Sequence, residues 1–252
     1  MLQISHVSKY FGGLAALREL DLTVHPGEII ALIGPNGAGK TTLFNIVTGF
    51  TAASTGTIRF LDVEIAELPA HRISHLGIAR TFQNIRLSPT MTVFENVWVG
   101  QHARAGTGLP SLWRQWSASE RERRERIDTI LALVGVADAR DSVATSLPLS
   151  MQRRVEIARA LATEPSLLLL DEPMAGTTPT DAAELCAVIR AVHGRGPKSL
   201  VLIEHSMDVV MELADRIVVL DFGQKIAEGT PAEIQRNSAV IEAYLGAEVE
   251  TC

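Results

Sequence analysis

The sequence is poor in cysteine and has no long apolar run. Its two cysteines, Cys186 and Cys252, lie far apart, and Cys186 falls in an apolar stretch with helical spacing, which fits a reducing compartment better than a disulfide framework. The longest apolar runs, at residues 29–33 and 167–170, are too short to cross a bilayer, and no segment resembles a signal peptide. We therefore expect a cytoplasmic chain.

An excess of basic residues is also missing. The chain has 23 Lys and Arg residues against 29 Asp and Glu, a formal net charge of −6. This composition lacks the broad positive surface on which nucleic-acid binding depends, so we expect no nucleic-acid partner. With 252 residues, 46% of them hydrophobic, the chain is long enough for one large domain with a sizeable core.

Short apolar runs separated by helical stretches indicate the fold class. Residues 1–60 alternate apolar and polar residues in runs broken by glycine-containing turns, which predicts strands. Later runs have the character of buried parallel strands joined by crossover helices, and they lie at residues 167–170, 200–203 and 217–220. The pattern predicts an α/β core.

The middle third of the chain follows a helical period instead. Apolar residues from about 93 to 163 recur every three or four positions, which predicts a helical segment inserted in the core. Gly, Pro, Trp and Arg between residues 102 and 117 indicate a surface loop. We expect a helix after it that Ser119 caps, with Glu122 three residues later.

A glycine-rich loop between an apolar run and a helix-like stretch follows the pattern G-x-x-x-x-G-K-[ST]. Its glycines let backbone N–H groups turn toward phosphate oxygens, Lys40 reaches the β- and γ-phosphates, and Thr41 ligates Mg²⁺. The sequence thus predicts a site for ATP and Mg²⁺. The nucleotide-binding residues that we expect here are Gly34, Pro35, Asn36, Gly37, Ala38, Gly39, Lys40, Thr41 and Thr42.

Two acidic residues, Asp171 and Glu172, end the apolar run at residues 167–170. Parallel strands bring their carboxyl ends to one edge of a sheet, so this pair is expected near the glycine-rich loop. Asp171 would hold Mg²⁺ through water, and Glu172 would act as the general base that polarises the attacking water. Taken alone, the pair is equally compatible with an acidic turn after a strand.

The remaining parts of a nucleotide site follow in a recognisable order. Gln83 lies between the glycine-rich loop and the acidic pair, and His205 follows the apolar run at 200–203. In this order the sequence resembles the ABC ATPases over nearly its whole length. The resemblance implies that Phe11 stacks on adenine, that Gln83 binds the metal ion and senses the attacking water, and that His205 contacts the γ-phosphate.

The same resemblance implies the architecture and the partners. It predicts one ABC ATPase domain over residues 1–252, a P-loop NTPase core with an antiparallel β subdomain, and a helical subdomain inserted at about 86–163. Such a subunit works with transmembrane permease subunits, with a second ABC ATPase subunit in a homodimer or heterodimer, and indirectly with a periplasmic or extracellular substrate-binding protein. It lies at the cytoplasmic face of the inner membrane, and residues 84–97 are expected to form the coupling surface.

Several stretches are similar to one branch of this family, the ATPases of branched-chain (hydrophobic) amino-acid importers. They lie at residues 80–86, 91–97, 99–102, 215–231 and 240–246. Urea and amide importers and lipid-export ATPases share much of this pattern, so those cargoes stay open. A weakly hydrolysing regulatory subunit is a further alternative, and it is opposed by the intact Glu172 and His205.

One motif departs from the family. Where ABC ATPases carry Leu-Ser-Gly-Gly-Gln, residues 147–151 read Leu-Pro-Leu-Ser-Met. In the family this loop closes over the γ-phosphate bound to the opposite subunit. Pro148 lacks an N–H donor, and Ser150 adds bulk where glycine allows close approach. One hypothesis is that only the site built on this chain's Lys40 and Glu172 works in a mixed dimer. The other is that backbone amides suffice and both sites turn over.

Overall fold

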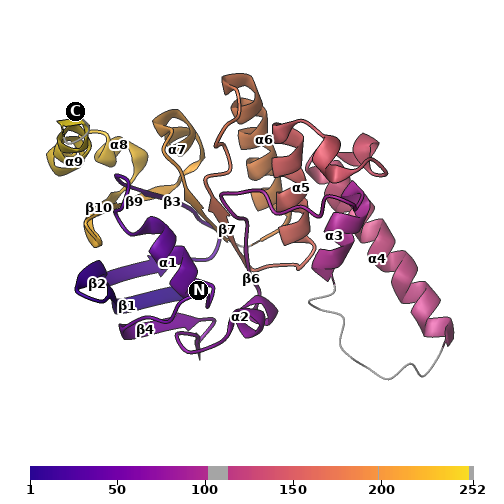
Figure 1. Cartoon of the computed structure of the whole chain (residues 1–252), viewed down its shortest axis with the longest axis horizontal. Coiled ribbons are helices and arrows are strands. Elements are labelled where there is room, and N and C mark those ends of the chain that lie inside the picture. The colour runs from indigo at the N-terminus through magenta and orange to yellow at the C-terminus, as the bar shows by residue number, and fades with distance from the viewer. Residues whose placement is uncertain (102–112, 198, 250–252) are drawn as a thin grey trace. The chain divides into compact units, whose positions relative to one another are not determined.

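The structure is a computed structural model that describes residues 1–101, 113–197 and 199–249, with the backbone alone for 113–119 and 245–249. The chain forms two compact units, whose elements are labelled in Figure 1. Unit 1 comprises Met1–Ile73, Leu169–Glu172 and the C-terminal segment after unit 2. Unit 2 comprises Ser74–Leu168 and Pro173–Pro197.

An antiparallel sheet of four strands, in the order β2-β1-β4-β5, forms the N-terminal part of unit 1. β1 (Leu2–Phe11) pairs with β2 (Leu14–Val24) and β4 (Thr55–Phe60), and β4 pairs with β5 (Val63–Glu64). Toward the end of β2, buried Leu20, Leu22 and Val24 alternate with exposed residues. This period of two is typical of a sheet with one face on the core, and it accounts for the predicted antiparallel β layer.

The second sheet of unit 1 is mainly parallel and lies in the order β10-β9-β3-β8-β7. β3 (Ile29–Ile33) runs parallel to both neighbours, β8 (Ser199–Ile203) and β9 (Arg216–Asp221), whereas β10 (Gln224–Gly229) is antiparallel to β9. Every residue of β3, β8 and β7 (Leu167–Asp171) is buried. The predicted buried parallel strands are therefore confirmed, because only a sheet covered on both faces buries all of its side chains.

The helices of unit 1 are short, and the first follows the glycine-rich loop. They are α1 (Lys40–Val47), α7 (Met207–Leu213), α8 (Pro231–Ile234) and α9 (Ser238–Val249), and α2 (Ala70–Leu76) runs from unit 1 into unit 2. α8 begins with a capping box, in which Thr230 and Glu233 satisfy each other's backbone N–H groups. Across the described ranges, no helix is long and apolar enough to span a membrane.

Unit 2 is mostly helical. It contains β6 (Ile78–Arg80), α3 (Val93–Gln101), α4 (Trp113–Leu133), α5 (Leu149–Leu161), α6 (Pro179–Arg195) and two 3₁₀ turns, η1 (Ala137–Ala139) and η2 (Ala144–Ser146). Val97 of α3, Ile127 and Leu131 of α4 and Val155 of α5 are fully buried and form its core. The predicted subdomain boundaries at about 86 and 163 stay a prediction.

The expected cap at Ser119 is wrong. α4 already begins at Trp113, so Ser119 lies inside the helix rather than at its start. Strong helix formers on both sides of Ser119, mainly Arg, Gln and Glu, favour continuation of the helix. Of the predicted surface loop, residues 102–112 lie outside the described part of the chain.

Candidate active site

The glycine-rich loop lies in unit 1 between the end of β3 and the start of α1. Two of its glycines allow close backbone approaches. A Cβ atom on Gly34 would lie 2.0 Å from the carbonyl oxygen of Leu220, and one on Gly39, whose φ is +100°, would lie 2.6 Å from that of Ala16. Any side chain at either position would collide with these backbone atoms, so the loop's path past β9 and β2 requires glycine.

Lys40 is held across this loop. Its ammonium donates to the carbonyl oxygens of Gly34 at 2.6 Å and Pro35 at 2.9 Å, and the residue is 6% exposed. Burial lowers the pKa of Lys40, whereas the nearby charges of Glu172 and Asp171 raise it. The structure therefore brings the predicted cation and the two predicted acids close together.

The other residues of the loop differ in exposure. Thr41 lies exposed in the first turn of α1, beside half-buried Thr42. Asn36 and Gly37 are exposed at the loop's tip, Pro35 is half-buried, and Ala38 is buried with its N–H donating to Pro35 O at 3.2 Å. Backbone N–H groups near the start of α1 offer the positive end of a helix dipole to an anion.

Asp171, Glu172 and His205 lie where β7 and β8 end. Asp171 is the last residue of β7 and is 2% exposed. The N–H of Glu172 donates to Ile203 O, the last residue of β8, at 3.0 Å. Its carboxylate Oε1 lies 3.0 Å from Nε2 of His205, so the two side chains orient each other.

The backbone of Glu172 is strained. Its φ is +47°, in the left-handed region that residues with a side chain avoid at a cost of about 1–2 kcal/mol. This conformation turns the chain directly after the buried strand β7 and leaves the carboxyl group 16% exposed. Strain of this kind persists only where the surrounding structure enforces it, and it is frequent at functional sites.

Phe11 lies at the end of β1 with 52% of its surface exposed. The ammonium of Lys9 is 4.8 Å from the centre of its ring and also donates to Ala52 O at 2.8 Å. Lys9 was not identified from the sequence, although residues two apart on a strand share one face. Its charge over the ring stabilises the aromatic side chain in place.

Gln83 belongs to unit 2, where it lies exposed on the loop after β6. The other two predicted metal ligands, Thr41 and Asp171, belong to unit 1. Over residues 1–101, 113–197 and 199–249, no group of three or more His, Cys, Asp or Glu side chains could bind a metal ion alone. A single carboxylate with hydroxyl and amide oxygens suits Mg²⁺, because nucleotide phosphates and water usually supply its other ligands.

The altered motif at residues 147–151 lies at the start of α5. Pro148 precedes the helix, Leu149 is 41% exposed, and Ser150 lies in the first turn. The hydroxyls of Thr178 and Ser150 both donate to the Asp181 carboxylate. These bonds, the one from Thr178 most of all, lower the pKa of Asp181. Ser150 is thus already engaged with α6 of the same unit.

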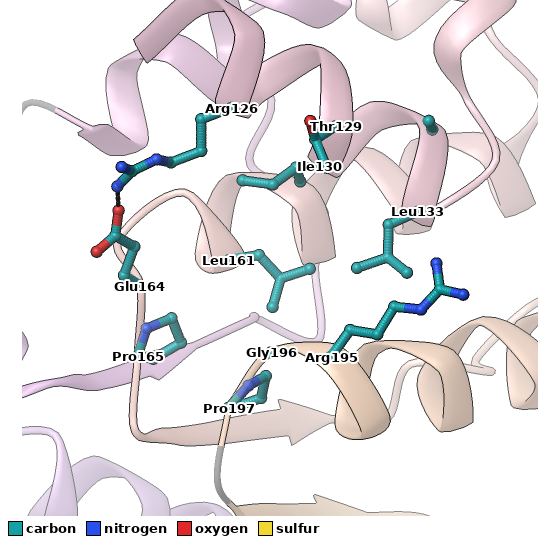
Figure 2. A pocket seen from close by; sticks show the side chains of 11 residues that line it. Arg126, Thr129, Ile130, Leu133, Leu161, Glu164, Pro165, Arg195, Gly196 and Pro197 are labelled. Atoms are coloured by element: carbon teal, nitrogen blue, oxygen red, sulfur yellow. Dashed lines mark ion pairs between the residues drawn. The ribbon is translucent and has the colours of Figure 1, made fainter. Parts of the chain in front are cut away.

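Unit 2 contains a cavity of about 700 Å³, which is lined by residues other than those predicted for the site (Figure 2). It has apolar walls that include Ile130, Leu133 and Leu161, an ion pair between Arg126 and Glu164 at one side, and Arg195 at the other. None of the predicted site residues lines it. The predicted chemistry is therefore independent of this cavity.

Comparisons with known proteins agree with the sequence pattern. A family model described as ABC transporter matches residues 17–175, and one described as branched-chain amino acid ATP-binding cassette transporter matches residues 224–250. The high-affinity branched-chain amino acid transport ATP-binding protein LivG of Escherichia coli (strain K12) is 42% identical over 98% of both chains. BraF of Pseudomonas aeruginosa, which carries the same description, is equally similar.

Solved structures show the same likeness. A nucleotide-free ATP-binding cassette from an ABC transporter superposes with a TM-score of 0.85 at 33% identity, over 97% of this chain and 98% of the other. The ADP conformation of another such cassette gives a TM-score of 0.84 at 31% identity, over 98% of both chains. The predicted fold class, an α/β P-loop core with an antiparallel β layer and added helices, is confirmed.

Proposed function

Because the chain belongs to the ABC transporter family and is an ATPase of that family, we propose that it drives an importer for branched-chain or related apolar amino acids. The observation that carries this proposal is its 42% identity, over 98% of both chains, to a branched-chain amino acid transport ATP-binding protein. The separate C-terminal match at residues 224–250 supports the same cargo class.

Different residues bind the adenine and the phosphates of ATP. The exposed ring of Phe11 stacks on the adenine from the side not covered by Lys9. Backbone N–H groups of the glycine-rich loop and the start of α1 surround the phosphates. Lys40 moves its hydrogen bonds from loop carbonyl groups to phosphate oxygens, because a charge-assisted bond to phosphate is stronger than a bond to a neutral carbonyl group.

Hydrolysis then depends on the end of β7. Glu172 accepts the proton of the attacking water as general base, and the His205 contact at 3.0 Å holds its carboxylate in one orientation. His205 also contacts the γ-phosphate. Thr41, Gln83 and Asp171 would hold Mg²⁺, which neutralises charge on the β- and γ-phosphates when it is bound.

The transporter's membrane part consists of other subunits in this proposal. The chain binds as a peripheral subunit to permeases at the cytoplasmic face of the inner membrane, pairs with a second ABC ATPase, and acts indirectly with a substrate-binding protein outside. Residues 84–97 contact the permease. In this segment Asn84 and Glu95 are exposed, whereas Val93 and Phe94 are buried and anchor it to unit 2.

Uptake of radiolabelled leucine by cells that depend on this chain tests the proposal. We expect Lys40→Ala to abolish uptake, and Lys225→Ala, which breaks only an ion pair with Glu228 on β10, to leave uptake near wild type. Labelled urea, tested in the same cells, covers one alternative cargo. Leucine uptake that is unchanged by Lys40→Ala, or a defect confined to urea, would contradict the proposed cargo.

A regulatory subunit that binds nucleotide and hardly hydrolyses it is the second candidate, favoured by the altered residues 147–151. The ATPase rate of the purified chain, alone and with its membrane partners, separates the two candidates. A hydrolysing subunit loses its rate when Glu172 is replaced by Gln. A regulatory subunit shows the same low rate with either residue.

A further inference from the structure

One face of α5 carries three charged side chains that reach into the loop bearing Gln83. Arg153, Glu156 and Arg159 are spaced three residues apart, so they lie on the same side of the helix. The carboxylate of Glu156 is 3.6 Å from the guanidinium of Arg153 and 3.5 Å from that of Arg159. This α5 charge cluster was not identified from the sequence.

The cluster binds both ends of one short backbone segment. Arg153 donates to Phe82 O at 3.2 Å. At the other end, Glu156 Oε1 accepts from the N–H of Arg86 at 2.9 Å, and Arg159 donates to the carbonyl oxygen of Arg86 at 2.6 Å. The segment from 82 to 86 is therefore fixed before and after Gln83, whose own side chain is exposed.

Two further contacts involve this segment and the arginine that holds it. The guanidinium of Arg86 lies 4.7 Å from the centre of the Phe82 ring, so the two tied ends also contact each other. Arg153 reaches a second segment as well, because it donates to Ala175 O at 3.4 Å, three residues after Glu172. A single arginine thus joins the Gln83 loop to the segment that follows the predicted general base.

Stability does not explain a cluster of this kind. The side chain of Glu156 is 1% exposed and that of Arg153 8%. Burial raises the pKa of the Glu156 carboxyl group, which shows that its charge is expensive to keep there. Buried ion clusters commonly stabilise a fold less than apolar residues of the same size would, and in some proteins they fix one geometry.

We propose that Arg153, Glu156 and Arg159 are positioning residues that hold residues 82–86, and with them the backbone of Gln83, in one geometry. The inference rests on the proposed role of Gln83 in the site. It predicts a specific defect when the cluster is broken: the Mg²⁺ dependence of hydrolysis changes, while ATP binding without Mg²⁺ does not, because the glycine-rich loop and Phe11 remain intact.

The test compares matched variants of the full chain in its membrane complex. Glu156→Gln keeps the size and the acceptor for Arg86 N–H but removes the central charge. Arg159→Gln, at a more exposed position, removes the bond to Arg86 O and provides a second variant should Glu156→Gln fold poorly. Glu184→Gln is the control, because it breaks the 2.6 Å ion pair between α5 residue Arg154 and α6.

We expect Glu156→Gln and Arg159→Gln each to raise the half-saturating Mg²⁺ concentration by about five- to tenfold, the effect of losing about one hydrogen bond. ATP binding in EDTA should stay within about twofold of wild type, and Glu184→Gln should match wild type throughout. Combined with Gln83→Ala, Glu156→Gln should add no further rise, because both changes act on the same contact.

Each other outcome overturns the inference in a distinguishable way. If Gln83→Ala raises the Mg²⁺ requirement but both cluster variants match wild type, the positioning role is wrong and the role of Gln83 stands. If Gln83→Ala itself changes nothing, the role of Gln83 fails and the inference with it. If Glu184→Gln has the same effect as the cluster variants, or if the effects of Gln83→Ala and Glu156→Gln add, the cluster is only structural.

Discussion

Glu172, the proposed general base, combines several unusual properties in one residue. It follows a fully buried strand, adopts a left-handed backbone conformation with φ of +47°, and keeps its carboxylate 16% exposed beside His205. The last two properties leave the carboxylate partly accessible and held in one orientation, as a general base requires. The neighbouring Asp171 shows the contrast, because it is 2% exposed.

Replacing Glu172 by Gln should separate binding from hydrolysis. Gln keeps the shape but cannot accept a proton, so we expect the rate of phosphate release to fall by about 10²–10⁴-fold. ATP affinity should change little, since Lys40 and the loop are untouched. Phosphate-release kinetics and nucleotide-binding titrations check this, with Glu67→Gln, an exposed carboxylate in the same unit, as the control.

At the scale of elements, the loop between β3 and α1 depends on how closely it passes its neighbours. Gly37 and Gly39 both have positive φ, +81° and +100°. Only Gly39 has a close neighbour, because a Cβ atom there would lie 2.6 Å from Ala16 O, whereas one on Gly37 would meet nothing within 4 Å. A side chain at Gly37 would therefore cause backbone strain alone, whereas one at Gly39 would cause both strain and a collision.

Gly39→Ala should destabilise the fold more than Gly37→Ala. We expect Gly37→Ala to lower the free energy of unfolding by about 1–2 kcal/mol, the cost of a left-handed alanine. Gly39→Ala adds the displacement of β2 backbone, a further loss of about 1–3 kcal/mol. Thermal unfolding followed by circular dichroism measures both, and equal melting temperatures would show that the Gly39 contact is unimportant.

The start of α5 bears on the molecule as a whole, because the family's loop at this position serves a nucleotide bound to another subunit. Here Pro148 has no N–H to donate, and the hydroxyl of Ser150 already bonds to Asp181. The nucleotide site proposed for this chain has all of its expected residues, whereas the motif expected to face a partner's nucleotide is altered. An asymmetric pair of ATPase subunits would follow.

A mixed dimer with an ATPase that has the unaltered motif tests this asymmetry. Glu172→Gln in this chain should abolish most ATPase activity, by at least about tenfold, while the matching change in the partner should reduce it less than about twofold. Steady-state ATPase assays of the two single variants give the comparison. Equal losses would favour the alternative, in which backbone amides suffice at both sites.

The sequence by itself determined the glycine-rich loop, the acidic pair and the order of Gln83 and His205, because each depends on a few adjacent residues after a strand that its apolar run identifies. It could not place the start of α4, because Ser119 resembles a helix cap in the sequence, whereas the helix begins at Trp113 and continues through Ser119. Local patterns identify chemistry better than boundaries.

Only the tertiary structure decided which distant groups meet. The bonds of Lys40 to its own loop, the contact of Glu172 with His205, and the α5 charge cluster around residues 82–86 join positions 5 to 73 residues apart. In the folded chain, packing brings Arg153, Glu156 and Arg159 against one backbone segment, to which all three bond. Sequence spacing places such side chains on one face of a helix, but packing alone determines what that face meets.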